Sequence, residues 1–295
     1  MIQPMLAQTA AAPFDRSDWL FEQKLDGVRC IAYLAVETRL QGRNGTDITR
    51  NFPELHGLHR QVRQPCILDG EIICASFELV QKRIHKEKAL DIRVASRLYP
   101  ATYAAFDILN VSGDSTAHLT LLARKALLAE VLTSEERGKA LPWQLGDGIA
   151  LFHQVAAGHG EGIMAKWSLS PYVEGRRSEY WLKIKNFQEG VFYVCGVTEG
   201  EGARGDTFGS LILGELVGDR MVYVGNAGSG LDDSELKHLL AVLSLLKGDS
   251  PFTRADIDRP VKFWTKPAIK VEVRYLERGS DGKLRFPTFR KLSNR

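Results

Sequence analysis

The apolar pattern of the chain changes abruptly after Trp181, and this change constrains the fold more than any other feature. Beyond it, short β-branched and aromatic stretches alternate with glycine-rich turns, as in VFYVCGVTEG, SLILGELVG and RMVYVGNAG. A helix interrupts them: Asp232 is a suitable N-cap with Glu235 three residues on, and Gly248 is expected to end the helix. Several strands and a single helix within about 100 residues predict a small barrel of the OB type.

The stretch before Trp181 mixes strands with helices instead. Residues 20–36 predict two strands joined by a tight turn at Asp26-Gly27. The other expected elements are a second strand–turn–strand unit over 66–74, a buried strand over 103–109, and helices over 77–88 and 118–132.

A chain of 295 residues is long enough for two domains of about 100–200 residues each. The change of pattern places the boundary between Asn186 and Gly190. We therefore expect an α+β protein, with a first domain of antiparallel sheets and helices over residues 1–187. An all-β barrel with one helix is expected over residues 188–295.

Charge is unevenly distributed along the chain. The net charge is only +3, yet residues 254–295 hold twelve Lys or Arg against five Asp or Glu, which makes this segment +7 and the rest −4. A basic segment beside a near-neutral body suggests a contact surface for a polyanion, and the solvated face of a basic protein is the alternative.

Apolar runs and cysteine usage bear on the compartment. No apolar run reaches the ~18–20 residues that cross a bilayer, and the N-terminus lacks the basic and apolar parts of a secretory signal. The four cysteines lie far apart without a CxxC pair, so buried thiols in a reducing compartment explain them better than disulfides or zinc. We expect a cytoplasmic monomer with no membrane contact.

The stretch from Glu22 to Arg29, which reads EQKLDGVR, carries the strongest chemical signal. It places the amine of Lys24 beside an Asp-Gly turn and beside Arg29, a fixed donor for anions. An amine attacks phosphorus only when it is unprotonated, and nearby cations or a metal favour that form. By itself, the KxDGxR pattern is explained equally well by an exposed hairpin.

Five further motifs follow along the chain: Arg43-Asn44-Gly45, LDGEI (68–72), AFDIL (105–109), EGIMAK (161–166) and WLKIK (181–185). In this order the six elements resemble the covalent nucleotidyltransferases, which comprise ATP-dependent DNA ligases, RNA ligases and mRNA capping enzymes. The resemblance implies an ATP-grasp-like nucleotidyltransferase (adenylation) domain over residues 1–187 and an OB-fold domain over residues 188–295. It covers nearly the whole chain.

The resemblance assigns a role to each matching residue. Lys24 is expected to attack the α-phosphorus of ATP and to carry AMP as a lysyl phosphoramidate, with release of pyrophosphate. The other expected roles are acceptance of the adenine amino group by Glu22, stacking on adenine by Phe106, ribose and phosphate contacts by Arg29, a phosphate contact by Arg43 and a ribose hydroxyl contact by Glu71. Outside this context, a Phe in an apolar strand is more often a core residue.

Glu161 matches the carboxylate with which the family binds its metal, so Mg²⁺ or Mn²⁺ is expected beside ATP. A divalent cation suits the chemistry because charge develops on phosphate oxygens, and Mg²⁺ needs only one or two carboxylates. Lys183 and Lys185 are two residues apart on one expected strand, so both can point at the α-phosphate. The solvated side of a sheet is the alternative for this lysine pair.

The wording of several segments resembles DNA ligases, in particular the compact end-joining ligases of bacteria and archaea. FEQKLDGVR, RNGTDITRNFPEL, WTKPAIKVEVRY and LRFPTFRKL carry this likeness. It implies an ATP-dependent DNA ligase that seals 5′-phosphate/3′-hydroxyl nicks in repair, with nicked duplex DNA as substrate and end-joining proteins as partners. Phosphate contacts are expected from the basic C-terminal segment and from Lys82, Arg83, Lys86 and Lys88 in the helix over 77–88. A solvated helix face is the alternative for these four residues.

The C-terminus departs from the family pattern. Compact ligases end in an Arg-x-Asp-Lys element after the FPTF-like stretch, whereas Ser293 stands where that arginine is expected. The residue that orients the pyrophosphate is therefore open, and Arg290, Lys291 and Arg295 are the nearby candidates.

Two other functions stay open from the sequence. An RNA ligase or capping enzyme shares this active site and differs in its strand or nucleotide. A non-catalytic OB-fold adaptor for single strands or nicks is the second alternative. Such a binding module would not need Lys24, Glu161, Lys183 and Lys185 together, so their joint presence favours an enzyme.

Overall fold

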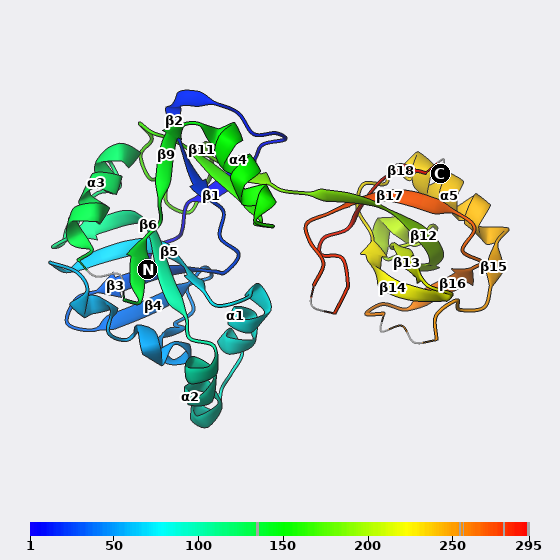
Figure 1. Ribbon diagram of the computed structural model, residues 1–295, viewed down its shortest axis with the longest axis horizontal. Helices are drawn as coiled ribbons and strands as arrows, with labels where there is room; N and C mark the ends of the chain where they lie inside the picture. The colour runs from blue at the N-terminus through cyan, green and yellow to red at the C-terminus, as the bar shows by residue number, and fades with distance from the viewer. Residues whose placement is uncertain (134–135, 254, 256, 280, 294–295) are drawn as a thin grey trace. The chain divides into compact units, whose positions relative to one another are not determined.

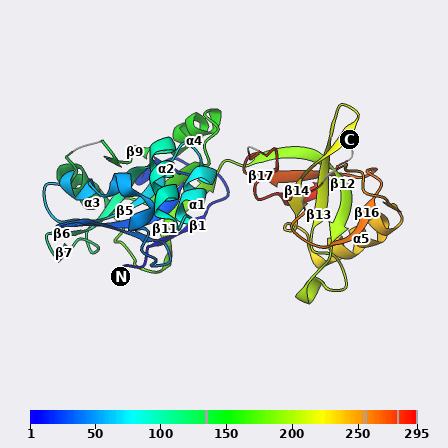
Figure 2. The same cartoon turned by 90° about the horizontal axis from the view of Figure 1, so that it is seen from below.

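The computed structural model of the protein describes residues 1–133, 136–253, 255, 257–279 and 281–293. The chain divides into two compact units, Met1–Asn186 and Phe187–Arg295, each with its own hydrophobic core. The first unit combines helices with two sheets, and the second is a strongly curled sheet with a helix against it (Figures 1 and 2). The expected α+β architecture, a mixed first domain followed by a barrel of the OB type, is confirmed.

One sheet of the first unit has the strand order β1-β11-β10-β2-β9 and is antiparallel except for the parallel pair β1–β11. Its strands are β1 (Leu6–Thr9), β2 (Arg16–Gln23), β9 (Trp143–Gly146), β10 (Gly162–Trp167) and β11 (Arg177–Lys185). Helix α4 (Gly148–Ala157) packs on this sheet, with Phe21, Val155 and Ile163 in the core between them.

The other sheet of the first unit has the order β4-β3-β5-β6-β7, with β8 beside β6. Its strands are β3 (Val28–Leu34), β4 (Thr38–Gly42), β5 (Cys66–Ile73), β6 (Thr102–Val111), β7 (Asp114–Ser115) and β8 (Gly138–Ala140). The short 3₁₀ helices of this unit are Thr49–Asn51, Pro53–Leu55 and Leu58–Arg60.

Three α-helices accompany this sheet among the described residues: α1 (Phe77–Ile84), α2 (Ala89–Leu98) and α3 (Leu121–Val131). The helix expected over 118–132 is confirmed as α3, whose N-cap Thr120 accepts a hydrogen bond from the Ala123 amide. The helix expected over 77–88 is shorter than expected because it ends at Ile84, and α2 was not expected from the sequence.

Both expected Asp-Gly turns in this unit are wrong. Strands β2 and β3 lie in different sheets, so the segment around Asp26-Gly27 crosses from one sheet to the other and closes no hairpin. Asp69-Gly70 lies inside β5, which pairs with β3 and β6 along its length. A Cβ at Gly70 would lie 2.5 Å from the Tyr103 ring, so close packing explains this glycine.

The second unit has the order β14-β13-β12-β16-β15, with β17 beside β12 and β18 beside β17. Strand β12 pairs in turn with β17, β13 and β16, which curls the sheet around the core. The strands are β12 (Gln188–Thr198), β13 (Leu211–Val217), β14 (Arg220–Ala227), β15 (Lys247–Gly248), β16 (Val261–Thr265), β17 (Lys270–Tyr275) and β18 (Thr288–Leu292). A short 3₁₀ helix spans Gly202–Arg204.

Helix α5 (Asp233–Ser244) covers this core with Leu236, Leu239 and Leu243. The predicted capping box is confirmed: Asp232 accepts from the Glu235 amide, and the Glu235 side chain accepts from the Asp232 amide. The expected stop at Gly248 is wrong, because the helix ends at Ser244 and Gly248 pairs with β16.

No helix among the described residues is long and apolar enough to span a membrane. All four cysteines are free thiols, and Cys30, Cys66 and Cys195 are buried, as expected.

Candidate functional site

A pocket of about 260 Å³ lies in the first unit and is lined from both sheets. The two sheets bring together motifs that are far apart in the sequence, because β2 and β11 share one sheet while β3, β5 and β6 share the other. Eight of the nine residues that the sequence singles out line this pocket: Glu22, Lys24, Arg29, Arg43, Glu71, Phe106, Lys183 and Lys185.

Lys24 and the ninth residue, Glu161, contact each other beside the pocket. Lys24 directly follows β2, Glu161 directly precedes β10, and these two strands are antiparallel neighbours. The Lys24 Nζ donates a hydrogen bond to Glu161 Oε2, and the Lys24 amide donates to Gly162 O at 2.9 Å. Main chain and side chain together fix the amine beside the carboxylate, whose side chain is only 8% exposed.

Lys183 and Lys185 reach the pocket from β11, as their spacing predicted. Lys185 Nζ lies 3.5 Å from Glu161 Oε1, so Glu161 faces two ammonium groups. Burial and the neighbouring cations, Lys185 first among them, lower the pKa of Lys183. A pocket that holds several cations so close together is suited to a strongly anionic ligand.

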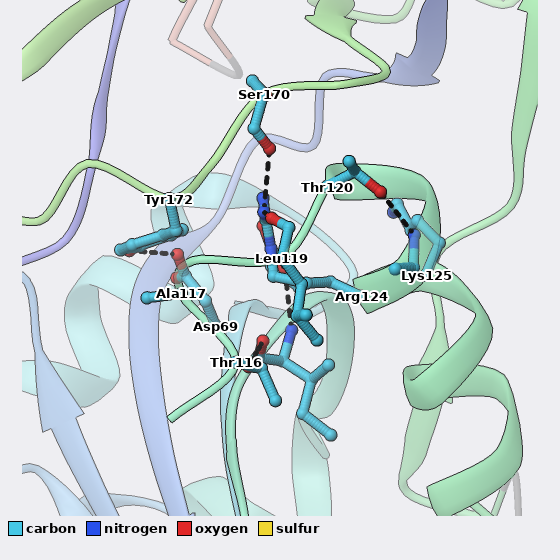
Figure 3. Close-up of polar contacts among 12 residues, drawn as sticks. Asp69, Thr116, Ala117, Leu119, Thr120, Arg124, Lys125, Ser170 and Tyr172 are labelled. Atoms are coloured by element: carbon cyan, nitrogen blue, oxygen red, sulfur yellow. Dashed lines mark hydrogen bonds and ion pairs between the residues drawn. The ribbon is translucent and has the colours of Figure 1, made fainter. Parts of the chain in front are cut away.

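Arg29 is held in one geometry by a buried carboxylate. Its Nε and Nη2 each lie 2.5 Å from an oxygen of Asp69, which is fully buried. The Tyr172 hydroxyl donates to Asp69 Oδ2 at 2.7 Å (Figure 3). The guanidinium carbon of Arg29 lies 4.6 Å from the Phe106 ring centre, within the range of a cation–π contact.

Glu71 lies on β5 opposite Arg29 on β3. Burial raises the pKa of Glu71 to about 7 in spite of the nearby charges of Arg29 and Lys24. A Cβ at Gly27 would lie 2.3 Å from Ile72 O and 2.9 Å from Glu71 Cγ. The glycine of the KxDG motif is therefore required for the close approach of the crossing segment to β5.

Sequence reasoning missed a buried cluster around Glu22. Glu22 is 1% exposed and contacts two ammonium groups, those of Lys125 on α3 and Lys166 on β10. The signal for Lys166 was a charge between Ala165 and Trp167 in a strand pattern. For Lys125 there was none, because a lysine in a helix is usually on its wet side.

Sequence reasoning also missed Arg177 and Asp69. Arg177 lines the pocket and donates to Ala7 O. An aspartate between apolar residues in ILDGEII was the available signal for Asp69.

The described residues contain no cluster of three His, Cys, Asp or Glu side chains that could hold a metal. Glu161 supplies one carboxylate at the edge of a cationic pocket. This donor set fits a Mg²⁺ or Mn²⁺ ion that takes most of its ligands from phosphate oxygens and water, and does not fit a closed protein cage.

One of the four residues expected to contact DNA in the 77–88 segment is wrongly assigned. Arg83 is 2% exposed, donates to Glu54 and to the carbonyls of Asn51 and Tyr99, and lies over the Phe52 ring. It is a core residue. Lys82 and Lys88 are exposed and Lys86 is half-buried.

The end of the chain forms an integral strand of the second unit. Strand β18 pairs with β17, and its Phe289 is 3% exposed in the core. Of the candidates for the pyrophosphate, Arg290 and Lys291 are exposed. Arg295 lies outside the described residues.

Comparison with known sequences matches both units. Residues 4–185 match the sequence model of the ATP dependent DNA ligase domain, and residues 204–294 match the ATP dependent DNA ligase C terminal region. The multifunctional non-homologous end joining protein LigD of Mycolicibacterium smegmatis is 31% identical over 98% of this chain. The DNA ligase of Pyrobaculum arsenaticum is 25% identical over 92%. The chain spans only 38% and 51% of the lengths of these relatives.

Comparison with solved structures agrees. The crystal structure of the ligase domain from M. tuberculosis LigD superposes with a TM-score of 0.56 at 28% identity, over 99% of this chain and 95% of that one. A Lig E DNA ligase superposes with a TM-score of 0.68 over 97% of this chain and 99% of its own, and its 18% identity supports the fold alone.

Proposed function

The chain belongs to the ATP-dependent DNA ligase family, and on that premise we propose that it seals 5′-phosphate/3′-hydroxyl nicks in duplex DNA with Lys24 as AMP carrier. The observation that carries the proposal is the placement of the Lys24 amine against Glu161, in a pocket that also gathers Lys183 and Lys185. An amine beside cations is what nucleophilic attack on a polyphosphate requires.

In the first step, the unprotonated Nζ of Lys24 attacks the α-phosphorus of ATP. A P–N bond forms, the bond to the bridging oxygen breaks, and pyrophosphate leaves. Lys183 and Lys185 stabilise the charge that develops on the α-phosphate oxygens, and Arg43 contacts phosphate. The hydrogen bond from Lys24 to Glu161 Oε2 holds the Lys24 Nζ at the edge of the pocket.

In the second step, the 5′-phosphate at the nick attacks the phosphorus of the lysyl-AMP and sets Lys24 free. In the third, the 3′-hydroxyl attacks the activated 5′-phosphorus, the phosphodiester bond forms and AMP leaves. Glu161 would hold a divalent cation, which would supply positive charge to the phosphate oxygens and to the leaving group.

The remaining pocket residues fit the rest of the nucleotide. Phe106 offers a ring for adenine, Glu22 accepts from its amino group, and Glu71 accepts from a ribose hydroxyl. Arg29, fixed by Asp69, binds the ribose and phosphate side.

The two parts of the chain have different roles in this proposed function. Residues 1–187 carry the adenylation chemistry, and residues 188–295 form the OB-fold domain that helps to hold DNA. The likeness to end joining LigD proteins supports a role in break repair with end-joining proteins as partners. The proposed working form is a monomer in the cytoplasm.

Self-adenylylation tests the assignment of Lys24. Incubation of the protein with α-labelled ATP and Mg²⁺ should transfer label to the chain, and Lys24→Ala should abolish it because the attacking amine is gone. Lys139→Ala, which removes an exposed lysine outside the pocket, serves as the control and should label like the wild type. Label retained by Lys24→Ala would contradict the proposal.

The nature of the strand is tested separately. Sealing of a nicked duplex, compared across DNA and RNA strands at the nick, should be fastest when both strands at the nick are DNA. Labelling by GTP in place of ATP would point to a capping enzyme, and preferred sealing of RNA to an RNA ligase.

A further inference from the structure

The Glu22 carboxylate is deeply buried at the pocket wall, and each of its two oxygens contacts a different lysine. Oε1 accepts a hydrogen bond from the Lys125 Nζ. Oε2 forms an ion pair with the Lys166 Nζ at 2.6 Å, and a further lone pair of this oxygen remains available. Lys125 therefore fixes Oε1, while Oε2 can still accept a hydrogen bond from a ligand in the pocket.

The two lysines stand on different sides of Glu22. Glu22 and Lys166 line the pocket, whereas Lys125 does not. The Lys166 Nζ lies 4.3 Å from the Phe106 ring centre and 4.2 Å from that of Trp181, so it contacts two aromatic rings that line the pocket. Lys125 reaches Glu22 from α3 behind the wall and can act on a ligand only through this carboxylate.

Helix α3 is itself held firmly where Lys125 leaves it. The neighbouring Arg124 is fully buried, pairs with Asp107 at 2.7 Å, and donates to the carbonyls of Leu119 and Ser170 (Figure 3). Asp107 directly follows Phe106 on β6. Two consecutive residues of α3 therefore hold pocket-lining residues in place. Arg124 fixes Asp107, the neighbour of Phe106, and Lys125 fixes Glu22.

Electrostatics favour an ionised carboxylate here. Burial opposes ionisation of Glu22, but the charges of Lys125 and Lys166 outweigh it and hold the pKa of Glu22 below its usual range. Burial lowers the pKa of Lys166 to about 8. The arrangement offers a carboxylate acceptor beside an ammonium donor at the same place in the pocket wall.

We propose that Lys125 is a positioning residue for nucleobase selection, which holds Glu22 so that its second oxygen accepts from the amino group of adenine. The inference rests on the proposed function and adds to it the residue that sets the nucleotide preference. Adenine carries an amino donor at C6 beside an acceptor at N1. This pair matches the Glu22 acceptor beside the Lys166 ammonium donor. Hypoxanthine and guanine carry a carbonyl at C6 and a proton on N1, so the match is reversed.

The selection rests on charge as well as on shape. A site with a buried charged acceptor rejects a base without the matching donor, because its acceptor then stays unpaired. Without Lys125, Oε1 loses its partner and Glu22 no longer has a fixed orientation.

The test compares nucleotides with and without the amino group on the full-length protein. Lys125→Met removes the ammonium and keeps the apolar body of the side chain. The affinity for ATP should fall about tenfold in titration calorimetry, while the affinity for inosine triphosphate changes less than twofold, because only ATP uses the Glu22 acceptor. In self-adenylylation the change should be in KM for ATP, with kcat within about twofold.

Two further variants separate positioning from packing. Lys125→Arg keeps a cation beside Glu22 and should restore most of the preference for ATP. Lys125→Gln keeps a donor without charge, and its preference for ATP should lie between those of Lys125→Arg and Lys125→Met. It replaces the methionine variant if circular dichroism shows that Lys125→Met does not fold. Arg83→Met is the matched control: it removes another buried cation of the same unit, whose partner Glu54 does not line the pocket, and should leave the preference unchanged.

The outcomes are distinguishable from those of the proposed function. An equal loss of affinity for ATP and inosine triphosphate, or a fall in kcat with the preference kept, overturns the inference and leaves Lys24 as AMP carrier intact. A wild-type protein that binds ATP selectively but is never labelled would overturn the AMP carrier and leave the role of Lys125 standing.

Discussion

At the scale of single residues, the pocket depends on side chains held by partners that do not touch the nucleotide site themselves. Arg29 takes its orientation from Asp69, Asp69 from Tyr172, and Tyr172 accepts from the Met5 amide at 2.9 Å. Asp69 and Tyr172 are buried, so their hydrogen bonds are exchanged little with water. The fixed arginine is therefore prepared before any ligand arrives, which reduces the cost of ordering on binding.

Glu71 predicts a pH dependence of ATP use. Burial raises its pKa to about 7, and an ionised carboxylate is the stronger acceptor for a ribose hydroxyl. The KM for ATP in self-adenylylation should therefore fall as the pH rises from 6 to 8. Glu71→Gln has no titrating group at this position and should lose this step, and an identical profile in the variant would exclude Glu71 as its source.

The same shift has an opposite effect on stability. The folded state binds the Glu71 proton more firmly than the unfolded state, whose pKa is near 4.5. The contribution of Glu71 to the free energy of unfolding is thus present below about pH 4.5 and is lost as the pH rises through about 7.

At the scale of elements, strand β5 shows how closely the sheets must pack to form the site. Its Asp69 and Glu71 face pocket residues, while Gly70 between them leaves space for the Tyr103 ring on β6. The Tyr103 hydroxyl in turn donates to Cys30 O on β3. The strand that carries two site carboxylates is thereby fixed against both of its neighbours.

Gly70→Ala tests this packing. The added Cβ would lie 2.5 Å from the Tyr103 ring and 2.6 Å from Ala104 O, so the free energy of unfolding should fall by about 1–3 kcal/mol. Urea denaturation measures the change. Gly57→Ala is the matched control, since nothing lies within 4 Å of its Cβ and its φ of −86° is open to alanine, and it should be neutral or slightly stabilising.

The limits of sequence reasoning are visible in the same strand. The sequence motifs named eight of the pocket-lining residues, because these motifs lie on or beside strands that the two sheets bring to the site. The Asp-Gly pairs were wrongly predicted as turns because a dipeptide indicates only local geometry. Gly27 and Gly70 are glycines because residues on neighbouring strands leave no space for a Cβ. Capping of α5 was predictable because both partners are three residues apart. The contact of Lys125 with Glu22 was not predictable, because the two residues are distant in sequence.

At the scale of the whole molecule, the +7 segment over residues 254–295 predicts how DNA is held. The log of the affinity for nicked duplex should fall linearly with the log of salt concentration, by about 0.9 per phosphate contact, and should change little with sequence. Fluorescence anisotropy at several salt concentrations measures the slope. Arg290→Ala removes an exposed cation of β18 and should reduce the slope by about one contact, whereas an affinity flat in salt would contradict the prediction.

The place of β18 in the second unit decides how the C-terminus is best probed. Truncation after Pro287 would remove the strand that pairs with β17 and the buried Phe289, so it would damage the barrel as a whole. Substitution of the exposed Arg290 and Lys291 leaves the strand in place. These point variants are therefore the appropriate means to ask which residue orients the pyrophosphate.

Every residue that lines the pocket precedes Asn186, where the first unit ends. A hybrid gene that joins residues 1–186 of this protein to the second unit of another ligase would therefore encode every residue of the pocket.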